Sequence, residues 1–142
     1  MALVTPVQAL QKALAAEHAA VHLYGLLGAQ SSKSREPTLF RKLDQTYEAH
    51  RAARDQLTVL VNARGRDPVA AKVDYVVPGP TTTSGQIEAV ARTIERRVTR
   101  TYGELIANTA GSERGWAISA LDASALREVA FGVEPSDFPG LS

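Results

Sequence analysis

Apolar residues recur at helical spacing in four segments of the chain, which span residues 5–30, 36–64, 84–110 and 113–131. Wound at about 100° per residue, each segment gathers its apolar positions into one arc, which is typical of an amphipathic α-helix. The only strand-like run, Tyr75-Val76-Val77, is short and bounded by proline. The pattern therefore predicts an all-α protein.

Capping residues mark the ends of these segments. Thr5 and Gln8 form a capping box at the start of the first helix, and a similar box opens the third. Gly65 is placed for a left-handed cap at the end of the second helix. We expect Ser112 to act as the N-cap of the fourth helix.

The connection between the second and third segments, residues 65–83, contains prolines and glycines and predicts an extended chain. Connections this long are unusual unless they run the length of a bundle, so that the third helix begins at the end where the second began. We therefore expect a single domain over residues 1–142, with a ferritin-like four-helix bundle and a long crossover between helices two and three. The crossover residues expected to lie against the bundle are Val73, Tyr75, Val76 and Val77.

Periodicity also assigns the inward side of the fourth helix and leaves an irregular tail after it. The tail is rich in proline and glycine, and we expect Phe138 and Leu141 to dock on the bundle. The positions of the fourth helix expected to face inward are Ala117, Ile118, Leu121, Ala125 and Val129.

Three polar residues lie on or near the inward faces, each on a different helix. Glu17 lies near the centre of the first apolar stripe and His50 at the middle of the second, while Glu95 lies on the flank of the third. Burying an unpaired carboxylate costs several kcal/mol, so Glu17 requires a partner. Arg54 lies close enough to the inward arc to reach such a carboxylate, or it packs its stem with its head in water.

The same three residues match part of a di-iron site. Di-iron bundles take one Glu from each of two helices and Glu-x-x-His from each of the other two. Glu17 and Glu95 match the single-Glu positions and His50 matches one His, but Tyr47 stands where the preceding Glu is needed and helix four lacks the motif. A buried Glu17–His50 hydrogen-bonded pair, a reduced iron or manganese site of Glu17, His50 and Glu95, and placement at a surface or interface all remain open.

Other polar groups give weaker signals. His18 and His22 lie one turn apart and could chelate a metal, but no third ligand is identifiable. The row formed by Arg92, Arg96 and Arg100 is expected to be a solvated face, with anion binding as the alternative.

Composition limits the possible functions. The net charge of +1 gives no reason to expect binding to nucleic acid or an anionic membrane, and the absence of cysteine removes disulfides and thiolate chemistry. No signal-peptide pattern and no apolar run of about 18 residues is present, so we expect a cytoplasmic protein without a membrane span.

The chain resembles an actinobacterial ferritin-like domain family of unknown function. The resemblance runs from about Leu10 to Leu141 and is carried by AAEHAAVHLYG, YEAHRAARDQL, DPVAAKVDYVVP and the terminal FPGL. It implies a ferritin-like fold and a homodimer, with recurring polar positions at Glu17, His18, His50 and Glu95. The family pattern implies a Glu on helix four, where this chain has Ala123 beside Asp122.

Two functions follow from these observations. The favoured hypothesis is a non-enzymatic structural, binding or regulatory bundle that lacks a complete di-iron site and needs no cofactor. The alternative is a metal-binding redox protein that uses Glu17, His50 and Glu95 to hold iron or manganese, completed by Asp122 or by a dimer partner. An RNA- or anion-binding surface on the helix-three arginines is disfavoured by the near-neutral charge.

Overall fold

The computed structural model describes residues 3–141, and within them the regular structure consists of four α-helices and no strand. The helices are α1 (Pro6–Gln30), α2 (Pro37–Ala63), α3 (Ser84–Ala107) and α4 (Gly111–Ala130). The prediction of an all-α chain with four helices is confirmed.

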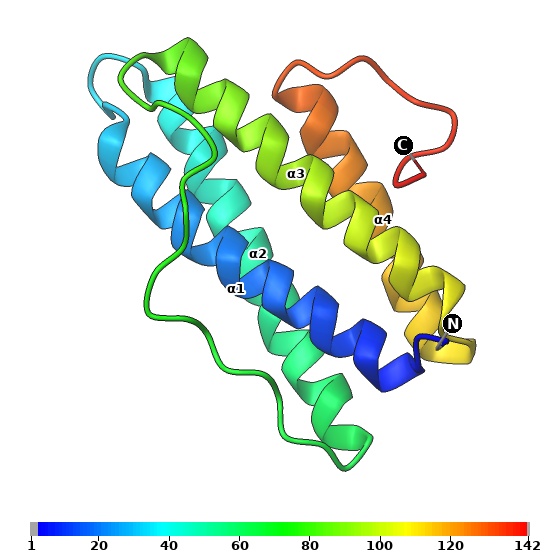
Figure 1. Ribbon diagram of the computed structural model, residues 1–142. Coiled ribbons are helices and arrows are strands. Elements are labelled where there is room, and N and C mark those ends of the chain that lie inside the picture. Colours follow the sequence, from blue (N-terminus) through cyan, green and yellow to red (C-terminus); the bar gives the residue numbers. More distant parts are fainter. Residues whose placement is uncertain (1–2, 142) are drawn as a thin grey trace.

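The crossover between α2 and α3 runs along the length of the molecule beside α1 (Figure 1). It returns the chain to the end at which α2 began, so α2 and α3 run in the same general direction while α1 and α4 run in the opposite one. α1 packs against α2 and α3, and α3 also packs against α4, whereas α2 and α4 contact each other little. α3 therefore has neighbours on two sides.

Local signals explain most of the helix ends. Thr5 and Gln8 form the expected capping box at the start of α1, and Gly65 has the expected left-handed backbone, with φ of 71°, just after α2. The expected cap at Ser112 was wrong, because α4 begins at Gly111, two residues earlier than expected, with Ala110 as N-cap. α3 ends at Ala107 instead of Ala110, and Asn108 is its C-cap.

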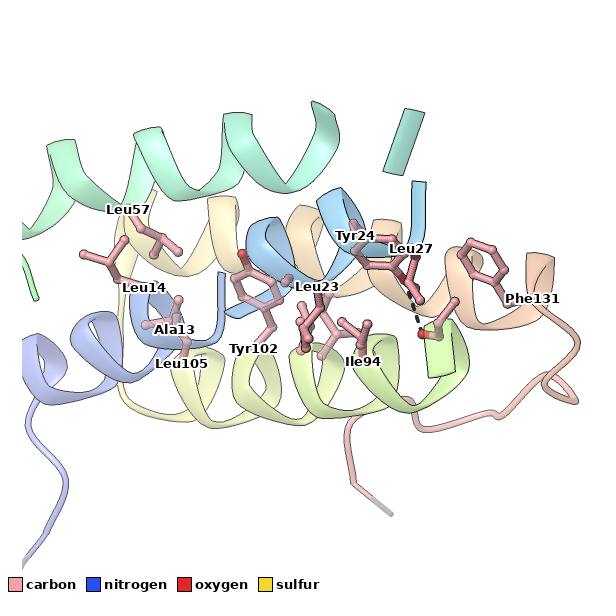
Figure 2. Close-up of a cluster of buried hydrophobic side chains, with 14 of the residues drawn as sticks. Ala13, Leu14, Leu23, Tyr24, Leu27, Leu57, Ile94, Tyr102, Leu105 and Phe131 are labelled. Atoms are coloured by element: carbon pink, nitrogen blue, oxygen red, sulfur yellow. Dashed lines mark hydrogen bonds between the residues drawn. The ribbon is translucent and has the colours of Figure 1, made fainter. Parts of the chain in front are cut away.

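The core is built from the inward faces of all four helices and is centred on leucines and two buried tyrosines, Tyr24 and Tyr102. Figure 2 shows both tyrosines inside this cluster, with Tyr24 hydrogen-bonded across the bundle to the carbonyl oxygen of Ala91 at 3.3 Å. Burial of each large apolar side chain contributes about 1.5–3 kcal/mol. This apolar surrounding makes any charge inside it costly unless the charge is paired.

The expectation about the inward face of α4 was wrong in part. On α4, Ile118 and Val129 are 44% and 41% exposed, because the inward face is formed by Ala117, Leu121 and Ser124. The helix is therefore rotated relative to the face that periodicity assigned.

The crossover and the tail also differ from expectation. Tyr75 and Val77 pack partly against the core, whereas Val73 and Val76 are exposed. Phe138 and Leu141 are also exposed instead of docked.

Candidate functional site: a buried charge network

The polar centre of the molecule lies where α1, α2 and α3 meet. Glu17, His50 and Glu95 are each 0% exposed. Helical spacing placed Glu17 and His50 inside correctly, but the flank position expected for Glu95 was wrong, because side chains of α2 and α4 both reach its carboxylate and bury it. The three sequence-predicted side chains are therefore brought together in the interior.

The imidazole of His50 lies between the two carboxylates. Its Nδ1 atom is 2.5 Å from Oε2 of Glu17, and its Nε2 atom is 3.1 and 3.0 Å from Oε1 and Oε2 of Glu95. When both ring nitrogens carry a proton, each donates to one of the two carboxylates, and the ring is an imidazolium. The ring of Tyr24 stacks on it, with ring centroids 5.3 Å apart.

The charge on His50 follows from a balance of opposing effects. Burial alone would lower the pKa of the imidazole, but the charges of Glu17 and Glu95 and their hydrogen bonds outweigh it and raise this pKa to about 9. The ring therefore stays charged at neutral pH.

Each carboxylate has a second partner. The hydroxyl of Tyr102 donates to Oε1 of Glu17 at 2.5 Å, and Nε of Arg127 donates to Oε1 of Glu95. Burial, together with the charge and hydrogen bond of Glu17, raises the pKa of Tyr102 well above its ordinary value, so its hydroxyl keeps the proton that it donates. The network thus contains two acidic groups, one imidazolium and one guanidinium, whose charges cancel.

Sequence reasoning missed the contribution of α4. Ser124 is fully buried and hydrogen-bonds the backbone oxygen of Glu95 at 3.3 Å, and it also accepts from Thr99 at 3.0 Å. The arginine that reaches a buried carboxylate is Arg127, whereas Arg54 pairs with its neighbour Asp55. Ser124 and Arg127 lie three residues apart on α4, a spacing that carries no signal until the inward face of the helix is known.

The other candidate residues have separate roles. His18 bonds the carbonyl oxygen of Val69 at 2.9 Å, and His22 lies 3.6 Å from Asp74, so both histidines attach α1 to the crossover. In the predicted arginine row, Arg92 is half-buried and donates to the backbone of Phe131.

The side chains do not fit a metal ion in this arrangement. Both nitrogens of His50 donate to carboxylates, so the ring presents no lone pair to a metal. Over residues 3–141, no group of three or more histidine, aspartate or glutamate residues is arranged to hold a metal ion. No buried side-chain nitrogen or oxygen in the same part of the chain lacks a hydrogen-bond partner.

Among the helices that the structure describes, none has the length and apolar character of a membrane span.

The fold and the site define a class of all-helical, four-helix proteins with a self-neutralised polar centre. The chain belongs to the family described as "Domain of unknown function (DUF4439)", which matches residues 9–142. The chain is also similar to the crystal structure of a conserved hypothetical protein from Mycobacterium tuberculosis, with 26% identity and a TM-score of 0.80 over 87% of this chain and 91% of that one. No curated protein matches the chain.

Proposed function

We propose that this protein is a ferritin-like, non-enzymatic structural, binding or regulatory bundle that acts as a homodimer in the cytoplasm of an actinobacterium. The connectivity supports the ferritin-like assignment, because one long crossover between the second and third helices is the arrangement of ferritin-like folds. The mycobacterial origin of the similar structure supports the proposed source.

The observation that carries the proposal is the saturation of the interior site. The three central side chains, Glu17, His50 and Glu95, are each 0% exposed. They form their hydrogen bonds with one another, with Tyr102 and with Arg127. Such a network stabilises one packing of the four helices and offers no group to an incoming substrate. Contacts with partners are therefore assigned to the surface.

The surface best suited to a second copy lies on α4 and the tail. A groove of about 680 Å³ lies between α3, α4 and the tail, and its lining includes Leu126 and Val129. These two residues are 71% and 41% exposed, and the tail residue Phe138 is 69% exposed. A groove lined by apolar and charged side chains, beside an exposed aromatic ring, allows the same surface of two copies to pack together about a two-fold axis.

The groove carries charges of both signs on opposite walls. The α3 wall carries Arg96 and Arg100, and the wall formed by α4 and the tail carries Asp122, Glu128 and Glu134, with Arg96 lying 3.8 Å from Glu128 of the same chain. A two-fold axis would place the basic wall of one copy opposite the acidic wall of the other.

Sedimentation equilibrium tests the homodimer. We expect the wild-type chain to have twice the monomer mass of 15.2 kDa, and Leu126→Asp and Phe138→Asp to give monomers with unchanged helical circular dichroism. Val73→Asp is the matched control, because Val73 is 100% exposed on the crossover and should leave the dimer intact. A monomeric wild type would refute the dimer, and dimeric Leu126 and Phe138 variants would refute this interface.

The second candidate is a redox protein that holds iron or manganese on Glu17, His50 and Glu95. The convergence of these three side chains from three helices favours it. It requires His50 to release its Nε2 proton. The test is the metal content of protein purified without a His tag, for wild type and Glu17→Gln. Stoichiometric metal that is lost in the variant would favour this candidate and overturn the first, whereas equal metal content in both would end it.

A further inference from the structure

Each of the four helices places a polar side chain at a position that corresponds to a ligand position of a di-metal bundle. Such a bundle takes single Glu ligands from two helices and a Glu-x-x-His pair from each of the others. Here Glu17 and Glu95 come from α1 and α3, and His50 comes from α2. On α4, the two side chains that point at Glu95 are Ser124 and Arg127, which have the same spacing of three residues.

The guanidinium of Arg127 contacts the carboxylate that His50 also contacts. Arg127 donates to Oε1 of Glu95, and His50 Nε2 lies 3.1 Å from that same oxygen. The Arg127 side chain is 21% exposed and Glu95 is 0% exposed, so the guanidinium covers the carboxylate from the solvent side. One oxygen atom of Glu95 is thus shared by two cationic donors.

We propose that Arg127 is the resident cation of this interior, placed against the Glu95 carboxylate that His50 also contacts, where a metal ion would be held in a di-metal bundle. Positions 124 and 127 of α4 are then the positions from which ligands would complete a site with Glu95 and His50. This inference rests on the proposed ferritin-like fold for the comparison, and on the observed contacts for the role of Arg127.

The arrangement explains how the network can remain closed without a metal. A divalent cation beside Glu95 would displace or repel the fixed guanidinium, and it would need a neutral His50 with a free Nε2 lone pair. With Arg127 present, His50 instead keeps a proton on Nε2 and donates it to Glu95. Glu17 contacts the Nδ1 atom of His50. In metalloproteins, a carboxylate in the same position orients an imidazole whose other nitrogen binds the metal.

The test uses the full chain and Co²⁺ alone as the probe. We expect the wild type to bind no stoichiometric Co²⁺ and to keep the same Tm in its presence. In the double variant Ser124→Glu/Arg127→His, we expect one Co²⁺ per chain, visible ligand-field absorption and a rise in Tm of about 5 °C or more. The Ser124→Glu change needs extra space in the core. The Arg127→His change provides part of that space, because an imidazole is smaller than an arginine side chain.

Two single variants keep the test decisive if the double variant folds poorly. Arg127→His adds one ligand without adding volume and should bind Co²⁺ more weakly than the double variant. Arg127→Lys keeps the cation and should bind none. A folded Arg127→His variant with no Co²⁺ response would refute the role of Arg127, and so would a folded double variant with none. Stoichiometric Co²⁺ in the wild type, lost in His50→Gln, would instead refute the proposed metal-independent function.

Discussion

The Nδ1 atom of His50 lies 2.5 Å from Oε2 of Glu17, and both side chains are completely excluded from solvent. This contact joins α1 to α2 at the middle of the bundle, while the other nitrogen of the ring joins α2 to α3 through Glu95. One imidazolium therefore connects three helices. Because the partners lie in an apolar core, the effects of perturbing it should be large and specific.

Stability should depend on pH through His50. Its pKa is raised from 6.5 to about 9 in the folded protein, so the folded state binds this proton more tightly than the unfolded state. The contribution, roughly 3 kcal/mol, is fully present below about pH 6.5 and is lost as pH rises through about 9. Urea unfolding between pH 6 and 9.5 measures it. A free energy of unfolding that stays flat or rises over this range, or the same fall in His50→Gln, would contradict the assignment.

Removal of the imidazole should destabilise the fold strongly. His50→Ala leaves Glu17 and Glu95 in the core without their shared cation, and breaking a buried pair in this way costs about 3–5 kcal/mol. His22→Ala is the matched control, because His22 is 37% exposed and its contact with Asp74 is 3.6 Å long. Its loss should cost about 1 kcal/mol or less. Equal costs for the two variants in urea unfolding would count against a buried charge network.

The two buried tyrosines should differ in what their hydroxyls contribute. Tyr102 donates to the carboxylate of Glu17 at 2.5 Å, whereas Tyr24 donates to the neutral backbone of Ala91 at 3.3 Å. Bonds to charged groups contribute about 1.5–3 kcal/mol and neutral ones about 0.5–1.5 kcal/mol. Tyr102→Phe should therefore reduce the free energy of unfolding more than Tyr24→Phe. The reverse order would show that Glu17 does not depend on this hydroxyl.

The tail should detach when a side chain is added at Gly140. This glycine has φ of +84°, and a Cβ atom there would lie 2.9 Å from the carbonyl oxygen of Thr99. Gly140→Ala should expose the tail to faster proteolysis while the helices stay folded. Gly115→Ala is the control, because its Cβ would meet nothing within 4 Å and should stabilise α4 by about 0.5–1 kcal/mol. A tail cleaved at the wild-type rate in Gly140→Ala would show that the contact does not hold it.

Sequence periodicity located most of the site because the spacing of a helix is fixed. Glu17 and His50 fall within narrow apolar arcs, so their burial could be predicted from residue positions alone. Glu95 lies at the edge of such an arc, and periodicity does not show that α3 is covered by both α1 and α4. How far round a helix burial extends depends on its neighbours in space.

The cation of α4 could not be predicted for a different reason. An arginine head group lies several bonds from its Cα atom, so the face of the helix does not determine which carboxylate it reaches. The exposure of Ile118 and Val129 shows that the apolar pattern of α4 also assigned the wrong face. Ser124 and Arg127 became visible as a pair only after the true inward face was known.

The most direct test of the central claim is the protonation state of the His50 ring, measured by nitrogen-15 NMR of labelled full-length protein. We expect Nδ1 and Nε2 both to carry a proton at pH 7, with the imidazolium persisting until pH approaches 9. A neutral His50 ring at pH 7, or one whose Nε2 is bound to a metal, would contradict a self-neutralised interior.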